Sequence, residues 1–522
     1  MKLKRVTKEV AQDIMKDKQR KIYLVDFSKA YLEELLEKYD LSAHLAGILL
    51  DTENRMWAEL QKDEQKIAFR GMELPVYSYA SICQLPQNVS FIILNDYFQE
   101  TYDKLAGWRR EEAELSNIYY FANQETEIDL YYRKKYECVP LENIIVFRSG
   151  PHTSSYVRGM DYADNARALF EYMLKNSYNQ KYELVWLVKN PSEFSYITEK
   201  YENVLFLSFD WSVSEKEEER DAYYHALCLA KYIFMTDAYG FARNARKDQV
   251  RVQLWHGCGL KTRINFVRCE HRYEYNIVIS EVYKKIHQNI YGLREDQVLV
   301  TGYPKDDQLF HPAADWKKEL SIPDAEAYIF WLPTFRASLK QLAELNEKTP
   351  EGQTGLPMIQ SIGELQELNE FLHKKNTVLI IKLHPFQNTE RICFDKMTNI
   401  VLLTNEMLVE RNLQINQILG KADGLISDYS SVAIDFLLLD KPLAFTLDDV
   451  EEYERSRGFV FHPICDWLPG NMIYSAFEFV QFIEDTISGR DRAREKRKAL
   501  TVKLHQFYDD QSSRRVIEAL GI

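Results

Sequence analysis

Short apolar runs alternate with amphipathic stretches along most of the chain, a pattern typical of α/β proteins with parallel sheets. A first series predicts strands at 22–26, 45–50 and 89–95, with a helix at 30–38. A second series predicts a helix at 165–175 and strands at 143–147, 184–188, 204–207, 232–236, 250–254, 276–279 and 298–301. A third predicts strands at 328–332, 377–381, 400–403, 424–426 and 443–445, and a charged helix from 491 onward.

Breaks in this pattern predict three domains, in keeping with 522 residues, more than one hydrophobic core usually supports. Gly302 and Pro304 interrupt the pattern and indicate a linker. The stretch 107–137 has no clean strand pattern and is interpreted as a transition. We therefore expect an accessory Rossmann-like domain and then two doubly wound domains that face a cleft, with boundaries at 1–140, 141–305 and 306–522.

The first turn of the accessory domain argues against a cofactor site. It reads Asp26-Phe27-Ser28-Lys29, whereas a dinucleotide site needs glycines there so that the backbone can approach pyrophosphate. A structural or docking role is therefore favoured over a dinucleotide-dependent enzyme.

Composition narrows the class of protein. Hydrophobic residues make up 46% and charged residues 28%, as in ordinary globular proteins. The net charge of −13 disfavours nucleic-acid binding, which usually carries a basic footprint. Seven cysteines without a CxxC pair indicate reduced thiols in a cytoplasmic protein. No apolar run approaches the roughly 18 residues of a membrane span. The basic stretch 8–21 predicts either a solvated surface helix or a weak interfacial helix.

Three short segments carry most of the candidate chemistry: 254–257, 382–385 and 427–431. Each follows a run predicted as a buried parallel strand, and ligands of doubly wound sheets bind outside the carboxyl ends of strands. His256 and His384 each lie at such an end. Histidine titrates near neutrality, so it can take a proton from an alcohol or donate a charged hydrogen bond to phosphate.

The neighbours of these histidines add to the case. Gly257 permits close approach of a substrate or of the opposing domain. Lys382 precedes His384 by two residues, and Arg336 follows another predicted strand. Both side chains are cations that suit phosphate.

A serine pair supplies hydroxyl groups at the third segment. Ser430 and Ser431 open a predicted apolar helix at 432–439, where free N–H groups favour an anion. A plain serine N-cap explains the pair equally well. Asp435, one helical turn later, would orient Ser431 or would be a buried polar residue.

Further motifs extend these segments across the second and third series. In order they are Gln253-Leu254-Trp255-His256-Gly257 with Leu260-Lys261, Thr301-Gly302-Tyr303-Pro304-Lys305-Asp306-Asp307, Leu332-Pro333-Thr334-Phe335-Arg336, Lys382-Leu383-His384-Pro385, Leu425-Ile426-Ser427-Asp428-Tyr429-Ser430-Ser431 with Asp435, Asp448 … Tyr453 … Arg457-Gly458-Phe459, and Tyr508-Asp509-Asp510. This order closely resembles the CDP-glycerol glycerophosphotransferases, the teichoic-acid and capsule primases and polymerases. The resemblance covers roughly residues 143 to 522.

The resemblance implies a GT-B fold and transfer of an alditol phosphate, glycerol phosphate or ribitol phosphate, from a CDP-alditol to a hydroxyl acceptor, with CMP leaving. His256 would be the general base, and His384 would act with it at the diphosphate. The donor-binding residues would be Arg336, Lys382, Thr404, Asn405, Ser430, Ser431 and Asp435, with Thr404 and Asn405 near the cytidine. In-line attack on phosphorus gains mainly from positioning and charge stabilisation. No clustered carboxylates with metal-ligand spacing stand out, so we expect neither a metal nor a cofactor.

The acceptor side departs from the family pattern. Cys258-Gly259 stands where many members carry Thr-Pro, and Cys258 has no independent reason to be a nucleophile. A local basic track would offset the acidity of the chain, with Lys261 and Arg263 on the acceptor side, joined by Arg268 and Lys305.

The family's acceptors are lipid-linked, which implies a protein at the cytoplasmic face of the membrane. We expect peripheral attachment through basic residues near the N-terminus, namely Lys2, Lys4, Lys16, Lys18 and Arg20. Two alternatives to the phosphotransferase stay open: a GT-B glycosyltransferase that uses a nucleotide sugar, and a non-catalytic scaffold on the same fold. The presence of both His256 and His384 disfavours the scaffold.

Overall fold

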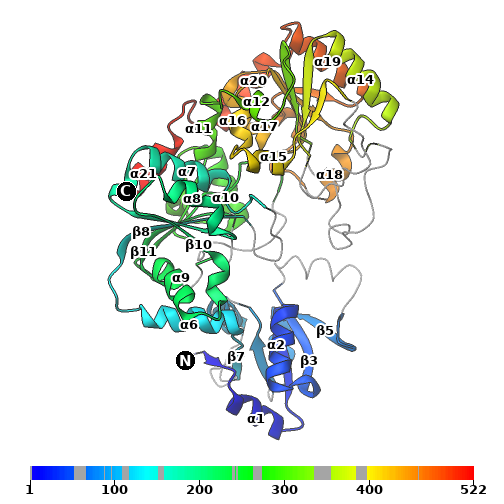
Figure 1. Cartoon of the computed structure of the whole chain (residues 1–522). Coiled ribbons are helices and arrows are strands. Elements are labelled where there is room, and N and C mark those ends of the chain that lie inside the picture. Colours follow the sequence, from blue (N-terminus) through cyan, green and yellow to red (C-terminus); the bar gives the residue numbers. More distant parts are fainter. Residues whose placement is uncertain are drawn as a thin grey trace.

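Three sheets follow one another along the chain in the computed structural model (Figure 1). The structure describes residues 3–51, 66–86, 89–95, 97–108, 117–150, 158–237, 241–242, 245–262, 273–333, 354, 356–383, 397–456 and 458–522. All described strand pairs are parallel except one edge hairpin in the first sheet and an isolated bridge. The predicted α/β fold with parallel sheets is therefore confirmed.

The middle sheet has seven parallel strands in the order β10-β9-β8-β11-β12-β13-β14. This is the order of a doubly wound sheet, with the change of direction between β8 and β11. Helices α7 (Asp164–Lys175) and α10 (Glu281–Tyr291) pack on one face, and α9 (Glu217–Leu229) packs on the other. The strands are β8 (Glu142–Gly150), β9 (Glu183–Val188), β10 (Val204–Ser208), β11 (Ala230–Asp237), β12 (Val250–Gln253), β13 (Tyr275–Val278) and β14 (Val298–Val300).

The third sheet repeats this order with six parallel strands, β17-β16-β15-β18-β19-β20. Helices α14 (Ile362–Lys374) and α19 (Ala476–Ile487) pack on one face. The short edge strand β20 was not predicted, because only one of its three side chains is buried. The strands are β15 (Ala327–Trp331), β16 (Thr377–Ile381), β17 (Ile400–Leu402), β18 (Gly424–Ser427), β19 (Leu443–Thr446) and β20 (Asn471–Ile473).

The first sheet has seven strands in the order β1-β7-β6-β2-β3-β5-β4. The hairpin of β4 and β5 escaped prediction because its strands are half exposed, and its turn places both Arg70 and Gly71 at positive φ. The strands are β1 (Lys4–Arg5), β2 (Lys21–Val25), β3 (Leu45–Leu50), β4 (Lys66–Phe69), β5 (Met72–Ser78), β6 (Val89–Ile93) and β7 (Ile118–Tyr120). Helices α1 (Lys8–Lys16), α2 (Lys29–Tyr39) and α4 (Phe98–Trp108) accompany it.

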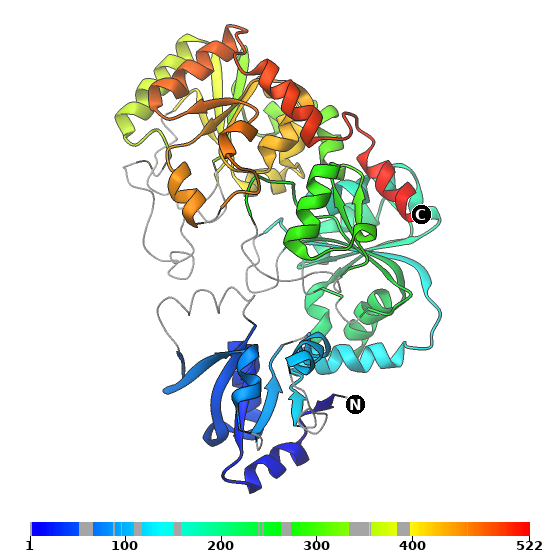
Figure 2. The ribbon, with the colours of Figure 1, turned by 180° about the vertical axis from the view of Figure 1, so that it is seen from behind.

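Helix α6 (Gln124–Lys135) joins the first sheet to the middle one. Near its start, Thr126 Oγ1 lies 3.0 Å from the Tyr31 hydroxyl of α2. Near its end, the Tyr132 ring stacks on Tyr224 of α9 at 4.5 Å between centroids. The stretch interpreted as a transition thus contains β7 and a helix that packs on both sides (Figures 1 and 2).

The last helix returns to the middle sheet. After α20 (Arg494–Leu504), helix α21 (Ser512–Leu520) crosses from the third sheet and lies beside α7, as both ribbon views show. Asp307, the first residue of α11 (Asp307–Phe310), accepts the N–H groups of Ser512 and Ser513, both at 2.8 Å. The chain therefore links its last two sheets twice.

One continuous apolar cluster extends from the α7 face of the middle sheet into the third sheet. It includes Phe147, Leu254, Phe330 and Leu425. The remaining helices are α8 (Ser195–Thr198), α12 (Trp316–Glu319), α15 (Asn405–Glu410), α16 (Ile415–Leu419), α17 (Val432–Asp435) and α18 (Val450–Ser456). None of the helices in the described part of the chain is long and apolar enough to cross a membrane.

Candidate active site between the second and third sheets

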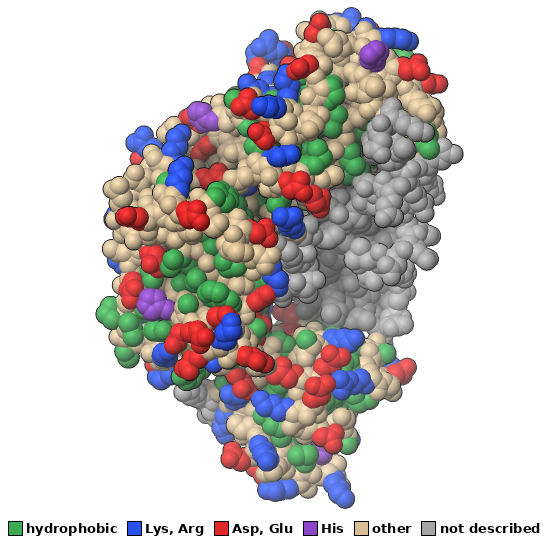
Figure 3. Space-filling view, in the orientation of Figure 1, with side chains coloured by type: hydrophobic (Ala, Val, Ile, Leu, Met, Phe, Trp, Pro, Cys, Tyr) green, Lys and Arg blue, Asp and Glu red, His purple; other side chains and the backbone are tan. Residues whose placement is uncertain are grey.

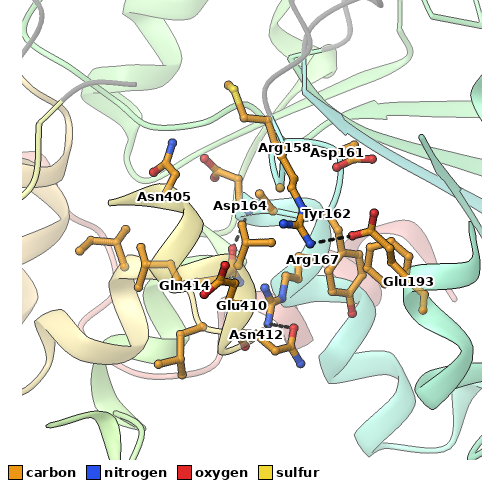
Figure 4. A pocket seen from close by; sticks show the side chains of 18 of the residues that line it. Arg158, Asp161, Tyr162, Asp164, Arg167, Glu193, Asn405, Glu410, Asn412 and Gln414 are labelled. Atoms are coloured by element: carbon orange, nitrogen blue, oxygen red, sulfur yellow. Dashed lines mark hydrogen bonds and ion pairs between the residues drawn. The ribbon is translucent and has the colours of Figure 1, made fainter. Parts of the chain in front are cut away.

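A cavity of about 550 Å³ lies between the middle and third sheets. One wall is built by residues 158–163 and the start of α7, and the other by α15, the start of α16 and Lys382 after β16 (Figure 4). Loops and helices of both units line it, with residues that include Arg158, Asp164, Arg167, Lys382, Asn405 and Asn412. The predicted cleft between two doubly wound units is therefore present.

Hydrogen bonds across the cavity hold its walls together. The Arg167 Nη2 group donates to Asn412, 2.6 Å to the backbone oxygen and 2.9 Å to Oδ1. The Asp164 N–H donates to Gln414 Oε1 at 2.6 Å. Gly159 lies so close to Val409 that a Cβ atom on the glycine would come within 2.0 Å of Cγ2. These contacts fix the start of α7 against α15 and α16.

His256 lies on the loop after β12 and is exposed. The preceding residue, Trp255, has a φ of 56°, and its ring stacks on the His256 ring at 4.9 Å between centroids. Buried Asn165 of α7 supports the loop by donating to the backbone oxygens of Leu254 (3.1 Å) and Trp255 (2.9 Å). The loop therefore presents His256 at the carboxyl edge of the middle sheet.

A second histidine lies behind Trp255, and the sequence did not point to it. His287 of α10 packs its ring on Trp255 at 5.7 Å between centroids. Burial, with a smaller contribution from the charge of His256, lowers the pKa of His287 to about 3. Its Nδ1 lies 2.6 Å from Asn276 Oδ1, so a neutral ring with Nδ1–H donating to the amide oxygen fits. Nothing in its mid-helix position distinguishes it in sequence.

The loop that carries His256 meets the serine pair directly. Gly257 has a φ of 155°, and a Cβ atom there would lie 2.4 Å from the Ser431 hydroxyl oxygen. The glycine thus allows close approach of the opposing unit, as predicted. Ser431 precedes α17, but its side chain makes no capping bond. The Ser430 N–H donates to Asp428 Oδ1 at 3.2 Å, and no hydrogen bond joins either serine hydroxyl to another described residue.

Asp435 and Lys305 form a buried ion pair beneath this contact. Asp435 is 1% exposed, and its Oδ2 lies 3.0 Å from Lys305 Nζ. Its carboxylate therefore faces Lys305, and a direct contact of Asp435 with the donor stays a prediction. Burial raises the pKa of the neighbouring Asp306 well above its ordinary range, and the charge of Asp435 raises it further.

Lys382 and Asn405 line the cavity, and Thr404 directly precedes Asn405. Burial lowers the pKa of Lys382 to about 8, which the charge of Glu406 only partly offsets. Asn405 is the first residue of α15, and its side chain is drawn at the cavity in Figure 4. Thr404 caps this helix through its hydroxyl, which accepts the Met407 N–H at 3.2 Å.

A further contact between the units involves Lys261. It forms an antiparallel bridge with Phe459, and the Thr262 N–H donates to the Gly458 oxygen at 3.1 Å. The Lys261 ammonium lies 6.0 Å from the centroid of the Tyr453 ring. The sequence had placed these two motifs apart, and only the fold brings them together.

Three predicted site residues, His384, Arg336 and Arg263, lie outside the described residues, as does Arg268. Cys258 is 1% exposed, and burial raises the pKa of its thiol to about 12, which agrees with its rejection as a nucleophile.

The sequence of this chain is similar to those of known transferases. Residues 140–521 match the model of the CDP-glycerol:poly(glycerophosphate) glycerophosphotransferase family. The teichoic acid ribitol-phosphate polymerase TarK of Staphylococcus aureus is 26% identical over 60% of this chain and 61% of its own length. The teichoic acid glycerol-phosphate primase of Bacillus subtilis is 24% identical over 68% of this chain and 88% of its own length. The chain spans about half to three fifths of the length of the ribitol-phosphate polymerases that it matches.

A solved structure shares the fold. The wall teichoic acid polymerase TagF superposes with a TM-score of 0.57 and 19% sequence identity, over 81% of this chain and 96% of that chain. The family match covers most of the chain, including both of its last two sheets and every motif named above. The chain belongs to the CDP-glycerol:poly(glycerophosphate) glycerophosphotransferase family.

Proposed function

We propose that the protein transfers glycerol phosphate or ribitol phosphate from a CDP-alditol to a hydroxyl acceptor in the synthesis of a teichoic-acid or capsule-type polymer. One observation carries the proposal within the family: the loop of His256 touches the serine pair of the opposite unit at Gly257 and Ser431. A base from one unit and hydroxyl groups from the other thereby meet at one edge.

The reaction is an in-line displacement at the β-phosphorus of the donor. The acceptor hydroxyl attacks the phosphorus and forms the new P–O bond. The bond to the bridging oxygen breaks, and CMP leaves with its electron pair. His256, neutral before the step, takes the proton of the hydroxyl.

The donor's diphosphate would lie near Ser430 and Ser431, with Lys382, His384 and Arg336 as cationic partners. The cavity next to Asn405 and Thr404 would take the cytidine, and its volume of about 550 Å³ lies within the usual range of small-ligand sites. Lys261 and Arg263 would act on the acceptor side.

We assign residues 141–305 and 306–522 as the two facing domains of a GT-B enzyme, the first on the acceptor side and the second on the donor side. Residues 1–140 would form an accessory Rossmann-like domain. The continuous apolar cluster and the return of α21 support a fixed arrangement of the two catalytic domains.

The protein would act at the cytoplasmic face of the membrane on a lipid-linked or polymer acceptor. Exposed Lys4, Lys16 and Lys18 remain candidates for contact with anionic lipid. Arg20 is less suited, because it donates to Ser90 (2.8 Å) and Asn117 (3.1 Å) of the first sheet.

Acidic and basic side chains are interspersed on the face in Figure 3. Sedimentation with anionic vesicles at low salt tests this attachment, and failure to bind would refute it.

A panel of donors tests the activity itself. CDP-glycerol and CDP-ribitol should support transfer, whereas nucleotide sugars should not. Turnover of a nucleotide sugar would instead favour the GT-B glycosyltransferase. No turnover of any donor by folded protein would favour the scaffold.

A further inference from the structure

Lys305 lies where the middle sheet passes into the third, in the short 3₁₀ helix Pro304–Asp306 that follows β14. Its N–H donates to Asn165 Oδ1 at 3.1 Å. The same Asn165 side chain donates to the loop that carries His256. The backbone of Lys305 is therefore tied, through one buried amide, to that loop.

The side chain of Lys305 contacts residues of both units. It is 8% exposed, and its Nζ donates to the backbone oxygen of His256 at 2.7 Å. The same Nζ lies 3.0 Å from Asp435 Oδ2 and 4.0 Å from Asp164 Oδ1. One ammonium group thus joins the His256 loop, helix α17 and the start of α7.

Asp435 belongs to the turn of helix that begins beside the serine pair. It follows Ser431 by four residues, and its N–H donates to the Ser431 oxygen at 3.1 Å. A Cβ atom on Gly257 would lie 3.6 Å from Lys305 Nζ and 2.4 Å from the Ser431 hydroxyl oxygen. The ion pair therefore lies directly behind the place where the base loop meets the serine pair.

The neighbouring carboxylates favour the ammonium form of Lys305 in this buried position. Burial alone would lower the pKa of Lys305, but the charge of Asp435, with those of Asp164 and Asp306, outweighs burial and raises it. Removing either partner would leave the other charge buried without its nearest counter-ion.

We propose that Lys305 and Asp435 form a positioning bridge that holds the His256 loop in register with Ser431 across the two units. The proposal rests on the phosphotransferase function proposed above. Neither residue contacts the reacting atoms in this scheme. The bridge sets the distance and angle between the base loop and the serine pair, so its loss acts on the chemical step and not on donor affinity.

Lys305→Met and Asp435→Asn test the bridge, with CMP release and CDP-glycerol binding measured separately. Misplacing a catalytic group by an ångström costs about 10²-fold in rate. We expect a fall in kcat of about that size for each variant, with donor affinity and KM for the donor changed less than threefold, on the order expected when ground-state contacts persist. The double variant Lys305→Met/Asp435→Leu removes both charges of the pair, so neither stays buried without the other; it should fold better than either single variant and still lose as much kcat.

Lys441→Met is the matched control. Lys441 is partly buried and donates to two backbone oxygens, those of Gly420 (3.0 Å) and Ala422 (2.6 Å), but it lies before β19, at the opposite edge of the sheet. The Lys441→Met variant should lose stability without the selective fall in kcat. Near-normal kcat in the folded double variant, or a loss of kcat in the control equal to that of Lys305→Met, would overturn the bridge. Absence of CMP release by the unaltered protein would instead refute the proposed function.

Discussion

The position of His256 depends on residues packed behind it in the same unit. Its ring stacks on Trp255, and Trp255 in turn packs on neutral His287. Asn165 holds the backbone of the same loop. A side chain held this way at an exposed strand end can act as a base without an ordering cost at each turnover.

Replacing His256 with Gln should retain size and some hydrogen bonding but remove basicity. We expect a fall in kcat of about 10² to 10⁴, the usual contribution of a positioned base. Binding of CDP-glycerol, followed by calorimetry, should stay close to that of the unaltered protein, since the donor is assigned to the other unit. A glutamine variant with substantial transfer activity would move the base elsewhere.

The lowered pKa of Lys382 predicts that donor binding depends on pH. Its lowered pKa, about 8, means that the ammonium loses its proton as pH rises through that value. Attraction for the diphosphate should therefore be present below pH 8 and weaken above it. Titration of CDP-glycerol between pH 6.5 and 9.5 measures this change, and Lys382→Gln should flatten it. An affinity that does not change across this range would contradict the assignment of Lys382.

At the scale of elements, the positions of the strand ends could be predicted from the sequence. The distant residues that contact the segments after these strands could not. Hydrophobic runs located β12, β16 and β18, and with them three site segments. The partner of Asp435 is Lys305, 130 residues away in sequence, and no local pattern encodes that pair. The isolated β-bridge between Lys261 and Phe459 likewise forms only where the two units pack together.

The loop after β12 requires glycine at position 257. A φ of 155° and the neighbouring Ser431 hydroxyl leave no room for a methyl group. Gly257→Ala should cost about 1 to 3 kcal/mol of stability through backbone strain and crowding, and should separate the base from the serine pair. Thermal unfolding and CMP release measure the two effects. Gly107→Ala in α4, where nothing lies within 4 Å of the added carbon, is the control and should be neutral or slightly stabilising. Equal behaviour of the two variants would contradict the close contact.

At the scale of the molecule, the chain crosses between its last two sheets and then returns. Helix α21 depends on Asp307, which accepts two of its first N–H groups. Asp307→Ala should remove this cap at a cost of about 0.5 to 2 kcal/mol, the usual range for helix caps. Faster amide exchange in 512–520 is the expected sign. Unchanged exchange there would show that apolar packing alone holds α21.

The nucleotide released from CDP-glycerol tests the central claim most directly. With a lipid-linked glycerol-phosphate acceptor, attack at the β-phosphorus releases CMP, whereas attack at the glycerol carbon would release CDP. The account predicts CMP in an amount equal to the glycerol phosphate transferred, dependent on the acceptor and lost in His256→Gln. Release of CDP, or transfer that persists at full rate in that variant, would contradict it.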